Sequence, residues 1–454
     1  MRISVSSRHR LFAPGLFHAG FFAVAVMWTV SPLVAGQFDW QGPLEVASGE
    51  AHVGPWRMNA SDFRYVDDPS VMLDEEGVAT VVWADQARQD VFLQRYDAAG
   101  ETLLDVPVNV SRSGDTFSWL PRVITAADAP DTVYVLWQEI IFSGGSHGGE
   151  ILFARSEDGG RTFSEPQNLS NTCHGAGKGR LTLQRWDNGS LDLAEGPDGT
   201  VWAVWSEYEG RLGVSRSRDR GRSFANPDYV AGVQGEPPAR GPSVAVGGDG
   251  RVHLAWTVGE DMAADIRYAV SDTEGRSFST PREVHASDGH SDAPTLAVDD
   301  QGRIHLAYAE SPDGLWQPAR IRYTRTGQGG EFGPPRELGA SQRNGHDSLG
   351  YPALAVAGEA VYVLWEQFPS LGKRSRGLGL TWSEDGGETF AASLTVPGSG
   401  EAGQGFNGSL QGLLMRKLAV NAAGEIAIVN STFHQGDSSV VRLIRAQNTA
   451  TAGQ

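Results

Sequence analysis

The sequence predicts an all-β fold of seven repeated sheets, a β-propeller closed by its N-terminal strand. Three observations support this prediction. An eight-residue turn occurs three times in full, a pair of alternating apolar strands occurs seven times, and a strand motif missing from the last repeat is found near the N-terminus. Short alternating strands with turn signals, repeated at regular intervals, are typical of propeller blades. A six-bladed ring is the alternative.

The recurring turn has the pattern Ser-x-Asp-x-Gly-x-Thr/Ser-Phe. Complete copies occupy residues 156–163, 217–224 and 383–390, with their aspartates at Asp158, Asp219 and Asp385. A fourth copy, 271–278, carries Thr273 in place of the aspartate. Aspartate accepts hydrogen bonds from nearby backbone N–H groups, and glycine tolerates a positive φ. These aspartates are therefore expected to be structural.

The repeated strand pair begins at a proline or similar residue and ends at an aromatic one. The clearest copies are 242–256 and 294–308. Other copies start near Pro69, Pro121, Leu191, Pro352 and Lys417. A Trp or Tyr at the same position in successive blades indicates core packing between blades. His253 and His305 lie inside second strands and are expected to be structural as well.

The fourth strand of each blade follows an aromatic-x-x-Pro signature, which begins at Phe163, Phe224, Phe278 and Phe332. The seventh repeat reaches the C-terminus with room for only three strands. Residues 40–46 carry the same signature at the other end of the chain. We therefore expect the N-terminal strand to complete the last blade, which removes an exposed sheet edge.

The domain organisation predicted from the sequence has three parts. Residues 1–36 combine three arginines with an apolar run that ends in small residues, as in an export signal. An uncleaved membrane anchor is the alternative for this segment. Residues 37–447 form the propeller, and residues 448–454 are expected to be a disordered tail. The signal predicts a periplasmic or extracellular protein with no stable membrane insertion after cleavage.

Composition excludes several classes of partner. The single cysteine, Cys173, allows no intramolecular disulfide. The formal net charge is −18, and loss of the three arginines of the signal makes it −21 (−18 − 3). Nucleic acids and anionic membranes are therefore disfavoured as partners. The expected partner is a glycan or a protein, and the expected oligomeric state is a monomer.

The eight-residue turn resembles the Asp box, or BNR repeat, of the sialidase superfamily of β-propellers. In that family the box joins the two outer strands of a blade, away from the active face. The resemblance covers almost the whole chain after the signal, and it implies a functional face formed by the loops that precede first strands and follow second strands. Catalytic sialidases of the family have six blades, so seven blades would be a departure.

The resemblance also suggests catalytic residues. A sialidase needs three arginines that clamp a carboxylate, an acid/base aspartate, and a tyrosine nucleophile activated by a glutamate. Residues 84–90 are similar to the family's segment with the second arginine and the acid/base residue, which assigns these roles to Arg88 and Asp90. Arg122, Arg240 and Arg416 are the candidates that could replace missing members of the clamp.

The position of the family's first arginine is a departure. Asp67 and Asp68 occupy it, and carboxylates there would repel an anionic sugar. With Trp119, Tyr351 and Glu366, these aspartates are the predicted ligand-binding residues of the face. The leading prediction is therefore recognition of a glycan or a protein partner, with catalysis left open. Hydrolysis of terminal sialic acids by an exo-α-sialidase is the alternative.

A third hypothesis is a metal-binding propeller. His290 and Asp292 lie in one loop that precedes a first strand, and His346 and Asp347 lie in the equivalent loop of the next blade. Imidazole and carboxylate groups that converge can bind a divalent metal. The spacing follows no recognised metal motif, so solvated loops remain the alternative. No other cofactor is expected.

Overall fold

The fold is that of a computed structural model. It describes residues 37–141, 149–172, 175–182, 185–188, 190–258, 264–315, 317–327, 329–339, 347–370, 374–407 and 416–450, with the backbone alone for 179–182, 185–188 and 402. All of them belong to the unit Val34–Gln454. The export signal predicted over 1–36 lies outside the described residues. No helix among the residues that are described is long and apolar enough to cross a membrane.

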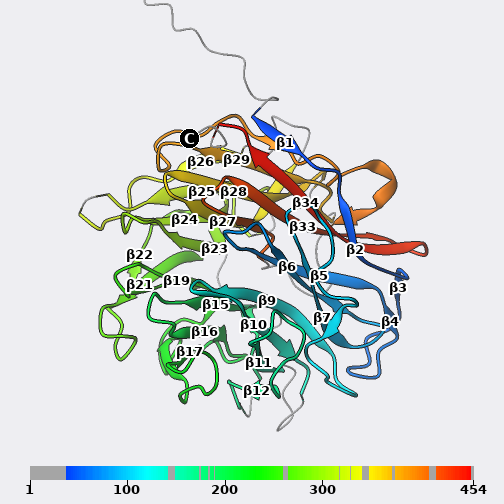
Figure 1. Cartoon of the computed structure of the whole chain (residues 1–454). Coiled ribbons are helices and arrows are strands. Elements are labelled where there is room, and N and C mark those ends of the chain that lie inside the picture. The colour runs from blue at the N-terminus through cyan, green and yellow to red at the C-terminus, as the bar shows by residue number, and fades with distance from the viewer. Residues whose placement is uncertain are drawn as a thin grey trace, which may run out of the picture. The chain divides into compact units, whose positions relative to one another are not determined.

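Six antiparallel four-stranded sheets follow one another along the chain and around a common centre (Figure 1). Blade 1 contains β5 (Val66–Leu73), β6 (Ala79–Asp85), β7 (Asp90–Tyr96) and β8 (Val108–Asn109). Blade 2 contains β9 (Ser118–Ala126), β10 (Ala129–Glu139), β11 (Glu150–Ser156) and β12 (Gln167–Asn168). Blade 3 contains β15 (Leu191–Glu195), β16 (Val201–Ser206), β17 (Leu212–Ser217) and β18 (Asp228–Ala231).

The next three blades have the same strand order. Blade 4 contains β19 (Ala239–Val246), β20 (Val252–Val258), β21 (Asp265–Ser271) and β22 (Arg282–Glu283). Blade 5 contains β23 (His290–Val298), β24 (Ile304–Ser311), β25 (Arg320–Arg325) and β26 (Arg336–Gly339). Blade 6 contains β27 (Ser348–Ala357), β28 (Ala360–Phe368), β29 (Leu378–Ser383) and β30 (Leu394–Thr395).

Blade 7 joins the two ends of the described chain. It contains β31 (Phe406–Asn407), β32 (Leu418–Val420), β33 (Glu425–His434), β34 (Ser438–Asn448), β1 (Phe38–Trp40) and β2 (Leu44–Gly49). In β2, Leu44 lies opposite Leu443 of β34, and Figure 1 shows the blue N-terminal strands beside red β34. The predicted seven-bladed ring and its closure by the N-terminal strand are therefore confirmed. Strand β34 continues through Asn448, whose side chain is buried.

Three small elements lie outside the blades. Two hairpins, β3 (His52–Val53) with β4 (Phe63–Arg64) and β13 (Lys178–Thr182) with β14 (Arg185–Asn188), precede the first strands of blades 1 and 3. A 3-10 turn, η2 (Ala402–Gln404), precedes β31.

The hydrophobic core lies between adjacent blades. The aromatic residues that end the second strands are buried, namely Trp83, Trp137, Trp205, Trp256, Tyr308 and Trp365. Their predicted role in core packing is confirmed. Glycines on neighbouring strands make room for these rings. A Cβ on Gly213 would lie 2.9 Å from Trp205, and one on Gly379 would collide with Trp365.

The Asp boxes join third to fourth strands, as the sequence predicts. In blade 3, Asp219 accepts hydrogen bonds from the Ser223 backbone N–H (2.8 Å), the Ser223 hydroxyl (2.6 Å) and the Ser217 hydroxyl (2.7 Å). The boxes at Asp158 and Asp385 repeat this pattern. The aromatic residue that ends a box packs against the preceding blade: the Phe224 and Phe153 rings lie 4.7 Å apart. Each box therefore fastens two blades together.

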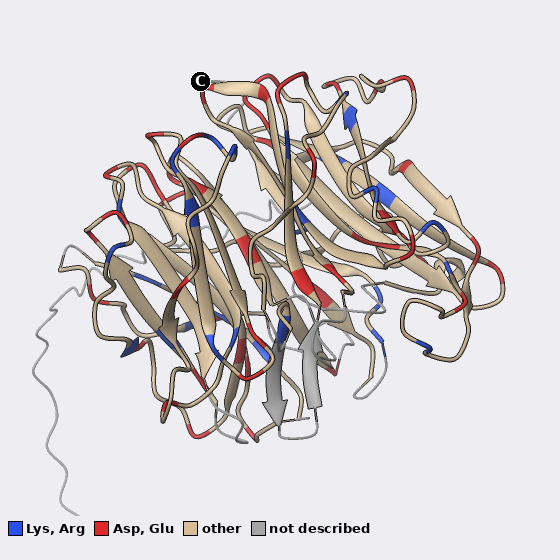
Figure 2. Cartoon of the chain, turned by 90° about the horizontal axis from the view of Figure 1, so that it is seen from below, with Lys and Arg blue, Asp and Glu red and all other residues tan. Residues whose placement is uncertain are grey.

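The two sides of the ring differ. We call the side where first strands begin and second strands end the mouth face, and the opposite side, which carries the Asp boxes, the box face. On the mouth face a bulge precedes the proline of five first strands, with a positive φ at Asp68, Leu120, Gly241, Ala293 and Tyr351. Lys and Arg positions alternate with Asp and Glu over the loops rather than forming one basic surface (Figure 2).

Candidate functional site

The centre of the mouth face is occupied by an ion-paired group from three blades. Arg416, just before β32, reaches across to β15, where its Nε and Nη2 donate to Asp192 at 2.8 and 3.0 Å. Asp192 also accepts from the Val244 backbone N–H (3.0 Å). Arg122 of β9 is buried beside this pair. Burial lowers the pKa of Arg122 to about 10, and the charge of Asp192 opposes that shift.

This group separates two cavities on the axis of the ring. The cavity on the mouth side, lined by Arg122, Asp192, Tyr351 and Arg416, has a volume of about 40 Å³. The cavity below it, lined mostly by apolar residues of the first strands, has a volume of about 400 Å³, and Arg416 lines both. The upper cavity has room for only a few water molecules. A saccharide is too large for this upper cavity.

A second buried group lies between blades 4 and 5 on the same face. Arg240 of β19 donates to Asp292 of β23 (3.3 Å) and lies 3.2 Å from His290 Nε2. Thr257 also donates to Asp292 (3.0 Å). Burial alone would raise the pKa of Asp292, but Arg240 and His290 hold it well below its usual range. Among the described residues, Arg240 Nε and His290 Nδ1 are buried without a hydrogen-bond partner.

Of the four residues in the metal hypothesis, the structure shows two, His290 and Asp292, close together. His290 Nε2 and Asp292 Oδ2 lie 3.7 Å apart, but the guanidinium of Arg240 already contacts both residues. His346 lies outside the described residues, and Asp347 directly precedes β27. In the described part of the chain, no group of three or more His, Cys, Asp or Glu side chains could hold a metal ion.

The residues assigned to catalysis by resemblance are not gathered into one group. Arg88 is exposed and pairs with Asp85 (3.5 Å). Asp90, at the start of β7, accepts from Ser111 (2.7 Å) and from the Ser113 backbone N–H (2.8 Å). Its carboxylate therefore holds the loop that follows β8. Arg122 and Arg416 meet at the centre, and Arg240 lies in the separate group with His290. A catalytic role for these five residues remains a prediction.

The predicted ligand-binding residues are mostly buried. Asp67 accepts a hydrogen bond from Gln86 (3.1 Å), and Asp68 lies 3.4 Å from the Leu120 backbone N–H. Glu366 accepts from Lys417 and Ser375. Tyr351 is half-buried and lines the upper cavity.

Trp119 is also buried, and it supports an aromatic platform that the sequence analysis did not find. The Trp56 ring is stacked on Phe63, with centroids 5.9 Å apart and 25° between planes, and its centroid lies 5.6 Å from that of Trp119. Trp56 is 50% exposed, and Val53 and Met58 nearby are also exposed. We call residues 53–58 with Phe63 and Trp119 the aromatic platform. A lone Trp beside Gly54 and Pro55, in a polar segment without repeats, was the only sequence signal.

Carboxylates at the ends of second strands brace the rest of the face. Glu139 accepts from the Trp137 indole N–H (2.9 Å) and from Ser118 (2.5 Å), and Glu207 accepts from Tyr229 (2.7 Å). Burial raises the pKa of both Glu139 and Glu207. The hydrogen-bond partners named for each glutamate lie in its own blade. We therefore infer that both glutamates stabilise the loops of the face.

Comparison with known proteins supports the fold. No family model and no curated protein matches the chain. Among solved structures, an ulvan lyase from a polysaccharide lyase family has a TM-score of 0.56 at 12% identity, covering 88% of this chain and 95% of its own. A protein of unknown function from Dyadobacter fermentans has a TM-score of 0.52 at 12% identity, covering 75% of this chain and 97% of its own.

A structure described as a Hadza microbial sialidase matches with a TM-score of 0.46 at 14% identity, covering 83% of this chain and 74% of its own. At 12% identity, the likenesses with TM-scores above 0.5 concern the fold alone, and they agree with the expected β-propeller.

Proposed function

We propose that the protein recognises a glycan that lies across the mouth face, with one sugar ring stacked on Trp56. The half-exposed indole of Trp56 is the observation that carries this proposal. An exposed apolar patch on an otherwise polar face is typical of a ligand-binding site. Trp56 is held between Phe63 and Trp119, so a ligand that stacks on it restricts little additional side-chain motion.

The charged groups of the face fit binding better than sialoside hydrolysis. A carboxylate clamp needs arginines whose forks are open to the substrate. The fork of Arg416 is filled by Asp192, and Arg240 is paired with Asp292. Hydrolysis would require both ion pairs to open. We therefore place exo-α-sialidase activity second, and a protein partner on this face third.

The known neighbours support a glycan as the ligand. One of the ulvan lyase structures was solved with a saccharide of glucuronic acid and rhamnose 3-sulfate. The export signal predicted over 1–36 would bring the protein to periplasmic or extracellular glycans. Asp67 and Asp68, which were expected to repel an anionic sugar, are buried and hydrogen-bonded, so an acidic polysaccharide of this kind is the first ligand to test.

Binding should be measured by calorimetry and by tryptophan fluorescence with the glucuronate–rhamnose sulfate oligosaccharide, a neutral glucan and a sialoside. Trp56→Ala should weaken binding about tenfold or more, because burial and stacking of one aromatic side chain contribute about 1.5–3 kcal/mol. The control is Val106→Ala, an exposed apolar residue between β7 and β8 on the box face.

Turnover should be followed on the same samples by the ultraviolet absorbance of unsaturated uronates, by new reducing ends and by released sialic acid. Binding by the wild type that Trp56→Ala removes supports the proposal, whether or not turnover accompanies it. Absence of binding to all three glycans, or equal binding by wild type and Trp56→Ala, contradicts it.

A further inference from the structure

A large cavity lies on the box face, between blades 4 and 5. Its volume is about 1130 Å³, a little above the range of about 300–1,000 Å³ that is usual for ligand-binding pockets. It opens where blade 5 lacks an Asp box. The corresponding segment, residues 326–332, is one residue shorter than a box and contains no aspartate. This cavity is therefore on the opposite side of the ring from the aromatic platform.

The shorter turn of blade 5 leaves a space beside blade 4. At the next junction, the Asp box of blade 6 fills the equivalent space beside blade 5. In blade 6, Gly387 of the Asp box packs against blade 5 so closely that a Cβ there would collide with the Tyr323 hydroxyl. At Gly329 and Gly330 of blade 5, a Cβ would meet no atom within 4 Å. The aromatic contact survives, because Phe332 still packs on Tyr268 with centroids 5.2 Å apart. The turn thus holds the blades together without closing the gap.

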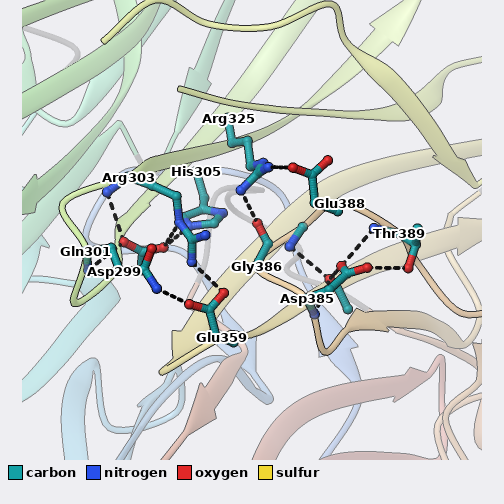
Figure 3. A network of polar contacts seen from close by, with 12 residues as sticks. Asp299, Gln301, Arg303, His305, Arg325, Glu359, Asp385, Gly386, Glu388 and Thr389 are labelled. Atoms are coloured by element: carbon teal, nitrogen blue, oxygen red, sulfur yellow. Dashed lines mark hydrogen bonds and ion pairs between the residues drawn. The ribbon is translucent and has the colours of Figure 1, made fainter. Parts of the chain in front are cut away.

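The filled junction between blades 5 and 6 shows what the open one lacks (Figure 3). His305 Nε2 lies 2.9 Å from Asp299 Oδ2. His305 Nδ1 lies 2.6 Å from the Tyr323 hydroxyl. Asp299 also accepts from Arg303 (2.5 Å), which donates to Glu359 (2.8 Å). Since Asp299 can only accept, Nε2 carries the proton of the imidazole and the tyrosine donates to Nδ1.

Between blades 4 and 5 the same histidine lacks its carboxylate. His253 Nδ1 lies 2.7 Å from the Tyr268 hydroxyl, as in the filled junction. The turn before it has the same backbone hydrogen bonds, but Gly247 stands at the position of Asp299. His253 is 4% exposed and lines the cavity. Its Nε2 has no hydrogen-bond partner among the described residues.

The protonation state of His253 follows from its surroundings. Burial lowers the pKa of His253 to about 4, so the ring is neutral near pH 7. We assign the Tyr268 hydroxyl as the donor to Nδ1 by analogy with Tyr323 and His305, and this assignment places the proton on Nε2. His253 lines the cavity, so an acceptor placed there can take the hydrogen bond of this N–H.

One arginine near this donor is open to an anion. Arg251, which corresponds to Arg303, is largely exposed, and its one carboxylate partner among the described residues, Asp249, lies 3.5 Å from its Nε. The other arginines that line the cavity are paired: Arg282 with Glu331, Arg303 with Asp299 and Glu359, and Arg325 with Glu388. Arg251 is therefore the cation of this cavity with the weakest carboxylate partner.

We propose that this cavity binds a small acidic ligand, whose carboxylate or sulfate takes the place that Asp299 occupies in the next blade. The oxyanion would accept from His253 Nε2 and from the guanidinium of Arg251. The remaining volume would hold the body of the ligand, beside Tyr268 and Phe278. This site is independent of glycan recognition at the mouth face.

The test uses calorimetric titration of the full propeller with sodium glucuronate, sodium sulfate and glucose. The wild type should bind glucuronate, and glucose should not bind. Equal affinity for sulfate would show that the oxyanion alone is recognised, and tighter binding of glucuronate would show that the sugar contributes. Absence of binding by both anions overturns the proposal.

Two variants locate the site. The double change Gly247→Asp with Asp249→Gln copies Asp299 and Gln301 of blade 5 and supplies the missing carboxylate from within. A Cβ at Gly247 meets only the movable Asp249 side chain within 3 Å, so the change fits the backbone. It should weaken glucuronate binding about tenfold or more, the effect of one hydrogen bond to a charged group, and raise the unfolding temperature.

Arg251→Met should also weaken binding, and Arg112→Met, an exposed arginine of blade 1, should not. If the Gly247→Asp, Asp249→Gln variant folds and binds glucuronate as the wild type does, the anion lies elsewhere and the proposal is wrong. Trp56→Ala should leave glucuronate binding in this cavity unchanged, so failure at one site is distinguishable from failure at the other.

Discussion

Replacing Asp192 by Asn should reveal how strongly the centre of the ring depends on one carboxylate. Asp192 accepts from Arg416 at 2.8 and 3.0 Å, from Ser243 at 3.2 Å and from the Val244 N–H at 3.0 Å. It also faces Arg122, which is fully buried. Asparagine keeps the shape but removes the charge that is paired with Arg416 and turns one acceptor into a donor.

The expected loss of folding stability follows from the arginine charges that stay without a partner. Removing one member of a buried ion pair costs about 3–5 kcal/mol, because the remaining charge stays buried without its partner. Arg416 is partly exposed and contributes less than Arg122 does. We therefore expect Asp192→Asn to lower the free energy of unfolding by about 3 kcal/mol. Adding Arg122→Met to this variant should restore a large part of the loss, because the buried cation is then removed as well.

The assay is urea unfolding followed by tryptophan fluorescence. The matched control is Asp128→Asn, which breaks an equally well-formed pair with Arg220 (2.9 and 2.6 Å) on the exposed surface and should change stability little. If Asp192→Asn is no more destabilising than this control, the central group is not a buried ion pair. If Arg122→Met fails to rescue it, the loss does not come from the unpaired arginine.

Two further predictions concern the Asp boxes. Hydrogen bonds from Ser223 lower the pKa of Asp219 to about 2, and those in the box of Asp385 outweigh its burial with the same result. Because these folded-state pKa values lie below the unfolded value, the boxes stabilise the fold above pH 4 and lose this contribution as pH falls toward 2. Replacing both aspartates by Asn should flatten the fall of unfolding temperature in that window, and an unchanged slope would contradict the assignment. Gly387→Ala should destabilise the fold by about 2 kcal/mol or more, through its positive φ and its collision with the preceding blade. Gly330 also has a positive φ but lies in open space, so Gly330→Ala should cost only about 1 kcal/mol. Both variants are compared by urea unfolding. Equal losses of stability would mean that the packing of this turn does not differ between blades 5 and 6.

The architecture was predictable because its signals are repeated. Each Asp box positions a serine, an aspartate and a glycine that must act together, and the aromatic-x-x-Pro signature at residues 40–46 predicts the closing strand. A feature that recurs at the same position in several repeats is a stronger signal than one that occurs once. The number of blades, their strand order and the burial of the second-strand aromatics follow from them.

The site was less predictable because its features occur once. Trp56 lies in a segment without repeats, and nothing in the sequence shows that Phe63 and Trp119 lie beneath it. The assignment of Asp90 relied on a local likeness. In the structure Asp90 has a counterpart in Glu150, the first residue of β11, which also holds the loop after its fourth strand. Comparing the Asn-x-Ser motifs at Asn109 and Asn168 would have suggested this shared role.

The free N–H of His253 illustrates a different limit. The sequence showed two equivalent histidines, and both were expected to be structural. His305 fits that expectation, since Asp299 and Tyr323 satisfy both ring nitrogens. The difference at His253 arises from a missing group at Gly247. Such an absence becomes visible only when the two junctions are aligned in space.

Hydrogen–deuterium exchange with and without the acidic oligosaccharide tests the central claim most directly. The account predicts protection of residues 50–64 and 117–122, where the aromatic platform lies, with no change at the complete Asp boxes. Protection confined to the box face, or no protection of the platform at a ligand concentration that saturates binding, would contradict recognition of a glycan at the mouth face.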